Sequence, residues 1–506
     1  MRTLAALLAI NLACVHHLER KTSPSLVTVD HQAPYLKVHM KSGDLYVLSE
    51  WRADEAAHTV HGNGALHGVD RQIVQRGAFS VAMADVALYE TNTINTSPSI
   101  AGMALVTGAS VVLTALCIAN PKACFGSCPT FYAPSDHGPV LQAEGFSDAI
   151  APSLETHDID ALWRTHITDG HLHLRMTNEA YETHVVKRAD VLAVRRPPGG
   201  RVLSTGEVLW AASELAPATA CTAPEGDCTA ALAEVDGRER TSLSDAEDLA
   251  AREVIELAFP PAPVRSGEAQ ARTGIVVAAR QSLVTTFLLY QGLAYLGTTA
   301  VDWIAALERG HRDGHDGHAV AQVLGGIEVQ VPHGAGWRTV GEIYETGPLA
   351  TDVHLLVLPP EARGDRIRLR LPRGGWRIDH VARAVLDHPI ATADIVRVAP
   401  RAIQGSLGVE FAADRTPATA LPIVTQPGDA YELDYDIPTG EVELFLDSRG
   451  YYLEWMRAQW LRETQPLAAL KMLLDPAQAL RDLAPAWKQM EPHAEDMFWR
   501  SRYARP

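Results

Sequence analysis

The chain of 506 residues is long enough for two or three domains, with 47% hydrophobic and 21% charged residues. This composition excludes disordered, collagenous and small disulfide-stapled proteins. The 61 acidic residues outnumber the 44 basic ones, and no run rich in Lys or Arg could follow a phosphate backbone, so we expect no nucleic-acid partner.

The N-terminus has the layout of a short bacterial secretory signal that ends at a lipidated cysteine. A single Arg precedes an uncharged apolar run, and Ala13 stands directly before Cys14. We expect residues 1–13 to be a cleaved signal peptide and residues 14–33 to be a linker. Acyl chains on Cys14 would hold the chain on a membrane of the bacterial cell envelope, on its periplasmic or outer-membrane face. Asn11 stands where lipoproteins usually carry Leu, and the alternative is an uncleaved apolar start with an incidental cysteine.

The next segments predict a small β-domain and two apolar helices. Residues 34–91 alternate apolar and polar side chains between Gly and Asp turns, which indicates a small antiparallel barrel or sandwich. Uncharged stretches within 92–122 and 281–319 predict two long apolar helices, each about as long as the roughly 20 residues of a membrane span. Because a lipid-anchored chain needs no span, we favour helices buried in protein over helices in the bilayer.

The remaining segments predict two β-rich domains and a helical end, which gives an α+β fold class dominated by strands. Residues 123–280 and 320–447 contain alternating strands, the second set resembling a β-sandwich. Within the first, SDAEDLAAREVIELA predicts a helix that Ser244 or Asp245 caps. Residues 448–506 are predicted to be helical, with a capping Asp475, a first-turn Pro476 and an apolar face of Leu480, Leu483, Trp487 and Met490.

Two of the six cysteines lie close enough in sequence to predict a disulfide. Cys221 and Cys228 bracket the polar turn TAPEGD, so an oxidising compartment would join them. Without this pair and Cys14, an odd number remains, namely Cys117, Cys124 and Cys128. At least one of these three is therefore unpaired or bonded to another molecule.

The segment CFGSCPTFY, residues 124–132, is the sharpest candidate for chemistry. A cysteine beside Gly and Ser in a tight turn could present a thiolate, but the sequence does not indicate which His would act as the base. We favour an architectural role, in which Cys124 and Cys128 fix the start of a strand by a disulfide or by burial. A zinc site lacks a second ligand pair.

The same segment carries a family resemblance. Together with LQAEGFSDAIAPSLETHDIDAL and LHLRMTNEAYETHVV, it resembles a family of uncharacterised bacterial envelope proteins built around a GSCPT-type motif. The resemblance implies an envelope location and a β-rich architecture, and it implies no reaction. The motif positions are Cys124, Gly126, Ser127, Cys128, Pro129 and Glu144.

Other candidate sites are weaker. The loop GHRDGHDGH could bind a divalent metal through His311, His315 and His318, although a solvated polar loop explains it more simply. His171 and His173 alternate on one strand face, which more often indicates a half-exposed sheet than a metal site. Trp376 and Trp455 are expected in the core. A glycosidase would need two carboxylates at a cleft, for which the candidates are Glu144, Asp148, Glu155, Asp158 and Asp160.

These observations favour a non-enzymatic function without a cofactor. The sequence contains no GxSxG elbow, Walker loop, HExxH or calcium loop. We expect a lipid-anchored scaffold that binds another envelope protein, and the alternative is an envelope hydrolase or thiol enzyme that uses a cysteine of the motif or a carboxylate pair. An open cleft holding Cys124 or Cys128 beside a His would favour the enzyme, whereas burial of both sulfurs would favour the scaffold.

Overall fold

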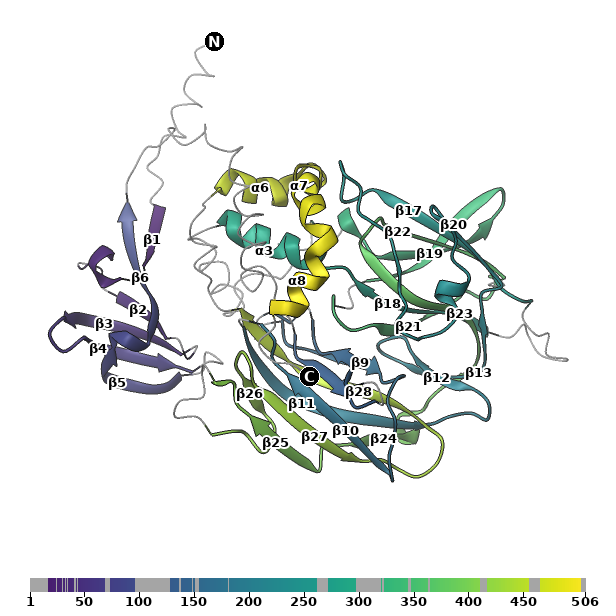
Figure 1. Ribbon diagram of the computed structural model, residues 1–506, viewed down its shortest axis with the longest axis horizontal. Helices are drawn as coiled ribbons and strands as arrows, with labels where there is room; N and C mark the ends of the chain where they lie inside the picture. The colour runs from purple at the N-terminus through teal and green to yellow at the C-terminus, as the bar shows by residue number, and fades with distance from the viewer. Residues whose placement is uncertain are drawn as a thin grey trace, which may run out of the picture.

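The computed structural model shows a small N-terminal sheet beside a larger body of stacked sheets and helices (Figure 1). The chain is β-rich, as the sequence predicts, and its helices lie mainly near the C-terminus. The structure describes residues 17–501 except 24, 30, 32, 34, 41, 43, 69–72, 96–127, 136–137, 148, 151–153, 181, 262–271, 297–319, 321–322, 345–346, 363–364, 410–415 and 455–464.

The N-terminal part is one antiparallel sheet, sheet A, around a small core that contains Leu36, Val38 and Leu48. Its order is β1-β6-β2-β3-β4-β5. The sequence prediction is wrong for two of its strands. Strand β1 lies in the predicted linker, and β6 includes the first residues of the predicted apolar helix. The two strands pair with each other along the whole of β1. The strands are β1 (His17–Ser23), β2 (Tyr35–Met40), β3 (Leu45–Asp54), β4 (Thr59–His67), β5 (Ile73–Ala82) and β6 (Val86–Asn95).

The body contains two outer and two inner sheets. Outer sheet B has the order β25-β27-β10-β7-β8, and inner sheet C has the order β24-β11-β28-β9 with β26 beside β11. Sheet B comprises β7 (Thr130–Ala133), β8 (Val140–Glu144), β10 (His171–Thr177), β25 (Ala402–Ser406) and β27 (Ala430–Asp436). Sheet C comprises β9 (Thr156–Ala161), β11 (Glu182–Arg195), β24 (Ile395–Val398), β26 (Ile423–Thr425) and β28 (Val442–Glu454).

Inner sheet D has the order β12-β13-β23-β18-β21 with β16 beside β23, and outer sheet E has the order β15-β14-β17-β22-β19-β20. Sheet D comprises β12 (Arg201–Ser204), β13 (Leu209–Pro217), β16 (Arg240–Thr241), β18 (Arg272–Gln281), β21 (Asp352–Val357) and β23 (Trp376–Pro389). Sheet E comprises β14 (Ala220–Ala223), β15 (Gly226–Asp227), β17 (Arg252–Ala258), β19 (Ile327–His333), β20 (Gly336–Ile343) and β22 (Arg366–Pro372).

The four sheets of the body stack in the order B, C, D, E, as their shared cores show. On β11, Val191 packs toward sheet B while Leu192 packs toward sheet D. On β18, Val276 packs toward sheet C while Val277 packs toward sheet E. The inner strands are therefore buried on both faces, which explains the continuous apolar run of β18, whereas the outer strand β10 alternates between buried and exposed residues.

The stacking also differs from the predicted domain division. Strands from the predicted domains 123–280 and 320–447 are neighbours in sheets B, C, D and E, as in the pairing of β18 with β23. The predicted helical segment 448–506 begins as the end of strand β28, which pairs with β11 along thirteen residues. Long-range pairing decides both features, and local sequence periodicity does not carry that information.

The helices pack together in one hydrophobic cluster above the inner sheets (Figure 1). In α7, the Asp475 side chain accepts a hydrogen bond from the Gln478 amide (3.2 Å), and the predicted apolar face from Leu480 to Met490 is buried, so this prediction is confirmed. The helices are α3 (Val284–Leu296), α6 (Pro466–Leu474), α7 (Pro476–Met490) and α8 (Ala494–Ser501). Short 3-10 turns are η2 (Leu26–Thr28), η3 (Met83–Asp85), η6 (Ala230–Leu232), η9 (Thr392–Asp394) and η11 (Glu491–His493).

The two predicted long apolar helices need correction. Of the segment 281–319, the described part forms α3, whose 13 residues are fewer than the roughly 20 of a span, and Phe287 and Leu293 are buried against the other helices. The remainder of 92–122, beyond β6, lies outside the described residues. Within the part of the chain that the structure describes, no helix has the length and apolarity to cross a bilayer.

The predicted helix at SDAEDLAAREVIELA is wrong. Asp245 Oδ1 accepts hydrogen bonds from the amides of Glu247 (2.9 Å) and Asp248 (3.0 Å), so it closes a turn and caps no helix. The residues that follow form β17, in which buried and half-buried positions alternate. Ser244 is buried and contacts α7 through the Trp487 indole N–H, which donates to its hydroxyl (2.9 Å).

Candidate functional site

Cys221 and Cys228 form a disulfide in the structure, with their Cα atoms 5.0 Å apart. Cys221 lies on β14 and Cys228 follows β15, so the bond closes the hairpin that the sequence places there. Both side chains are buried in the core between sheets D and E. This pairing is the one that the polar turn predicts, and its position indicates a structural role.

The described part of the GSCPT motif lies at the start of β7. Cys128 is 5% exposed, and its thiol donates to the backbone carbonyl of Ser147 (3.6 Å). The Tyr452 hydroxyl donates to the same carbonyl (3.3 Å), which ties sheet C to this turn. Cys124, Gly126 and Ser127 lie outside the described residues, as do Cys14 and Cys117.

Glu144, another motif position, links sheet B to the loop before β21 of sheet D. Its carboxyl is 1% exposed, and Oε2 accepts hydrogen bonds from the amides of Leu349 (2.8 Å) and Ala350 (3.4 Å). Gly347 has φ +86°, and a Cβ at that position would lie 2.6 Å from Oε2, so the approach requires glycine. Glu144 therefore fixes the turn that joins two layers of the stack.

The carboxyl of Glu144 is mostly neutral at neutral pH. Burial and the nearby Glu182 carboxylate raise its pKa, the two amide hydrogen bonds and the charge of Arg280 lower it, and the net pKa is about 8. Its Oε1 atom is buried and accepts no hydrogen bond from the described residues. A charged carboxylate here would lack the compensation that buried charges need.

Further polar side chains from β11 and β28 surround this junction. Glu182 lies opposite Glu454 in the sheet, and His184 lies opposite Tyr452. The His184 Nε2 and Glu182 Oε1 atoms are 2.8 Å apart, and the Tyr290 hydroxyl of α3 donates to Glu454 (2.5 Å). We call this set the buried polar cluster: Cys128, Glu144, Glu182, His184, Tyr290, Tyr452 and Glu454.

The buried polar cluster contains the side-chain types of covalent catalysis but holds them away from solvent. A nucleophilic thiol needs a thiolate that a substrate can reach. The Cys128 sulfur is buried, and burial also raises the pKa of the Tyr452 hydroxyl well above its ordinary value. The arrangement suits a cross-link between layers, in which hydrogen bonds join sheet B, sheet C and α3.

Of the other predicted carboxylates that the structure describes, none is among the residues that line the cavity beside Trp163. Asp160 on β9 is 4% exposed, and burial raises its pKa, as do the charges of Asp158 and Asp352. Glu155 lies nearer the surface. Partial burial raises its pKa, but hydrogen bonds from Lys187 and Arg449 outweigh this effect and hold the pKa below its ordinary value. Asp148 lies outside the described residues.

The predicted histidine sites contain no metal-binding group within the described residues. His171 and His173 share the exposed face of β10, where their Nδ1 atoms lie 2.9 and 2.7 Å from carboxylate oxygens of Asp436 and Asp434 on β27. They are the half-exposed sheet residues that the alternation indicates. The loop with His311, His315 and His318 lies outside the description, as does Trp455, whereas Trp376 is 1% exposed and belongs to the core as predicted.

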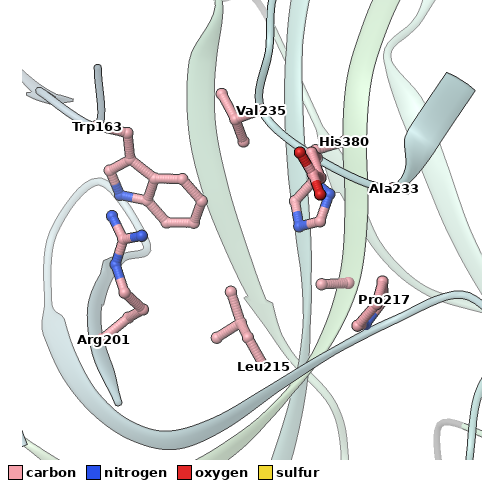
Figure 2. Close-up of a pocket in the computed structure, with 9 residues that line it drawn as sticks. Trp163, Arg201, Leu215, Pro217, Ala233, Val235 and His380 are labelled. Atoms are coloured by element: carbon pink, nitrogen blue, oxygen red, sulfur yellow. The ribbon is translucent and has the colours of Figure 1, made fainter. Parts of the chain in front are cut away.

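A cavity of about 320 Å³ lies at one edge of sheet D, beside the loop that follows η6 (Figure 2). Nothing in the sequence pointed to it, because its residues come from distant segments and form no motif. Trp163 lines one side, and the Arg201 guanidinium lies over its ring, 4.1 Å from the centroid. The lining residues are Trp163, Arg201, Leu215, Pro217, Ala233, Glu234, Val235, His380 and Ala382.

Hydrogen bonds hold the polar residues of this cavity in place. Arg201 donates from Nε (2.7 Å) and Nη2 (2.8 Å) to the carboxylate of Glu443 on β28. The His380 Nδ1 atom lies 3.1 Å from the carbonyl oxygen of Leu232, so Nδ1 carries the proton that is donated. Burial lowers the pKa of His380, which keeps the imidazole neutral.

Comparison with known proteins gives little guidance. No family profile and no characterised protein sequence matches the chain. Among solved structures, it is similar to the arabinofuranosyltransferase AftD from Mycobacteria, with 12% identity and a TM-score of 0.17 over 88% of this chain and 31% of that one. The chain thus spans about a third of that protein, and a likeness of this size does not define a shared fold.

Proposed function

We propose that this chain is a non-catalytic scaffold of the bacterial cell envelope, which is held to a membrane through lipid on Cys14 and binds another envelope component. The observation that carries the proposal is the burial of Cys128, whose thiol donates to the Ser147 carbonyl. A sulfur in that position supports the architectural interpretation of the motif.

Glu144, a further described motif position, supports the same proposal. Glu144 bridges sheet B and the loop before β21, and its hydrogen bonds go to backbone amides. Cys128 and Glu144 thus act on the geometry of the layer stack. A rigid stack of four sheets suits a protein whose work is to hold other components at fixed positions.

The alternative is an envelope hydrolase or thiol enzyme. Its best support is the raised pKa of Glu144, since a carboxyl that stays neutral at pH 7 can act as a general acid. However, this carboxyl is 1% exposed and does not line the cavity of Figure 2. A hydrolase would need that carboxyl to meet its substrate, so we favour the scaffold.

The experiment is purification of the native complex from detergent-solubilised membranes, with the tag at the C-terminus so that the N-terminus can be processed. The proposal predicts that the chain elutes with a partner in a fixed ratio, measured by mass photometry and peptide mass spectrometry. Elution of the chain alone, in the membrane fraction and at the mass of one copy, would count against a scaffold. The matched control is Cys14→Ser, which we expect to enter the soluble fraction.

A further inference from the structure

Helix α6 presents four leucines to solvent on one side, which we call the leucine face. Because an α-helix has about 3.6 residues per turn, the four positions lie next to one another along the helix. A helix that is apolar all round is normally covered all round, so this face lacks an apolar environment that α3 and α7 do not supply. The leucine face consists of Leu467, Leu470, Leu473 and Leu474, which are between 41% and 75% exposed.

The buried side of α6 shows which way the leucine face points. Ala469 and Met472 lie in the same hydrophobic cluster as residues of α3 and α7. The Gln465 amide, just before α6, donates to the Tyr295 carbonyl near the end of α3 (2.9 Å). In Figure 1, α3 lies between α6 and the sheets. The leucine face is therefore directed away from the sheet stack.

The start of β1 lies on this same side of the molecule. His17, its first residue, pairs with Asn95 at the end of β6, and the arrowhead of β6 points to the upper side of Figure 1, where α6 also lies. Sheet A is joined to the body by a hydrogen bond from Gln426 Nε2 to the Ser42 carbonyl (2.6 Å).

The short distance along the chain between Cys14 and β1 indicates what covers the leucine face. Cys14 stands three residues before His17, which corresponds to at most about 11 Å of extended chain. Acyl chains on Cys14 would therefore hold the start of β1 at the surface of a bilayer. A bilayer on that side of the molecule also lies on the side to which the leucine face points.

A second copy of the chain fits the leucine face less well. A stable dimer buries about 800 Å² on each partner. Even a whole aromatic side chain buries only about 150–250 Å², so four partly exposed leucines fall short of that area. A bilayer has no such requirement, because helices lie in its interface with one apolar face buried.

We infer that the leucine face of α6 enters the outer part of a lipid bilayer, with the helix parallel to the membrane plane. The nine residues of α6 span only about 14 Å, less than half of the hydrocarbon core. This inference rests on the proposed lipid anchor for its orientation, and it adds a second contact that places the helices between the bilayer and the sheet stack.

The contact alone is weak and reversible, since even one myristoyl chain gives only marginal membrane binding. A chain without lipid therefore dissociates when cells are fractionated, but it binds to vesicles at millimolar lipid. The net charge of −17 adds no attraction to anionic headgroups, so the binding must be apolar and must resist salt.

The test is co-sedimentation with phosphatidylcholine vesicles of the mature chain, residues 14–506 with Cys14→Ser, which carries neither lipid nor the apolar residues 1–13. We expect binding that 1 M NaCl does not weaken and that added phosphatidylglycerol does not strengthen. A double variant with Leu470→Ser and Leu474→Ser should bind at least tenfold more weakly, because two apolar side chains no longer leave water.

Strand β5 offers a matched control on another part of the surface. Ile73 and Val74 are 46% and 67% exposed, close to the 48% and 75% of Leu470 and Leu474. A double variant with Ile73→Ser and Val74→Ser should bind vesicles as the unaltered chain does. Circular dichroism of both double variants separates loss of the contact from loss of the fold, and Leu474→Ser alone keeps the test informative if the leucine variant does not fold.

Several results would overturn the inference. It fails if the chain does not bind vesicles, if 1 M NaCl releases it, or if the β5 control loses as much binding as the leucine variant. It also fails if the leucine variant instead lowers the mass of the chain by mass photometry without vesicles, which would assign the face to a second copy. An acylated Cys14 without vesicle binding by the unacylated chain would remove the leucine contact and leave the anchor and the scaffold proposal standing.

Discussion

Replacement of Glu144 by glutamine should stabilise the protein at neutral and alkaline pH. The folded structure holds this carboxyl mostly neutral, with a pKa of about 8 against an ordinary value of 4.5. Unfolding exposes it to water, where it ionises at neutral pH and so favours the unfolded state. The glutamine side chain of the Glu144→Gln variant cannot ionise, and its amide oxygen can still accept from the Leu349 and Ala350 amides.

The size of the effect follows from the two pKa values. Because the folded pKa is raised, the contribution of the carboxyl to stability is fully present below pH 4.5 and is lost as the pH rises toward 8. The loss is about 1.4 kcal/mol per pH unit, which gives roughly 3 kcal/mol between pH 4.5 and pH 7. Above pH 8 both states are ionised and the loss levels off.

The assay is urea unfolding at several values between pH 4.5 and pH 9, followed by tryptophan fluorescence, for the unaltered chain and Glu144→Gln. We expect the difference in free energy of unfolding to grow with pH in favour of the variant, until it levels off near pH 8. The control is Glu155→Gln, which removes a carboxylate that pairs with Lys187 and Arg449 near the surface and should destabilise by no more than about 1 kcal/mol. A difference that does not change with pH, or a variant that is less stable at pH 8, would refute the reasoning.

Three further predictions test the fold and the anchor. Replacing both Cys221 and Cys228 by Ser should lower the free energy of unfolding by roughly 2–3 kcal/mol, measured by urea titration, because the unfolded chain loses its closed loop; no loss would show that the bond is absent from the native protein. Gly347→Ala should destabilise the protein by about 1–3 kcal/mol, since the new Cβ would lie 2.6 Å from Glu144 Oε2 in a left-handed backbone conformation. The control is Gly334→Ala, which should cost less because the space around Gly334 is open. Equal losses of stability in thermal unfolding would contradict the role of the Glu144 contact. Intact mass spectrometry of native protein should give a mature chain that begins at an acylated Cys14, and a mass that retains residues 1–13 would disprove the anchor.

The sequence predicted those elements whose pattern is local. The cap at Asp475 and the apolar spacing from Leu480 to Met490 define α7 because a helix forms from neighbours along the chain. The alternation in β10 likewise identified a strand with one buried face. The failure at β17 came from Asp245, because an acidic residue before an apolar run suits a helix cap and a turn equally well.

The candidate sites could be predicted only in part. The motif resemblance identifies Glu144, but its neighbour Glu182 stands alone in its own strand, and only the register of β11 against β28 places Glu454 opposite Glu182. The cavity was harder to predict, because Trp163 and His380 lie far apart along the chain and share no spacing signal. The pairing of distant segments determines these contacts, and the spacing of residues along a single sequence does not reveal that pairing.

The central claim is that the GSCPT motif fixes the layer stack and carries no chemistry, and the reactivity of Cys128 tests it most directly. Folded protein is treated with iodoacetamide at neutral pH, and the modification of Cys128 is followed over time by peptide mass spectrometry, with urea-unfolded protein as the reference. We predict that Cys128 reacts only when the protein unfolds, because the residue is 5% exposed and its thiol donates to the Ser147 carbonyl. Rapid and selective alkylation in the folded state, with an unchanged circular dichroism spectrum, would contradict the claim and favour the thiol enzyme.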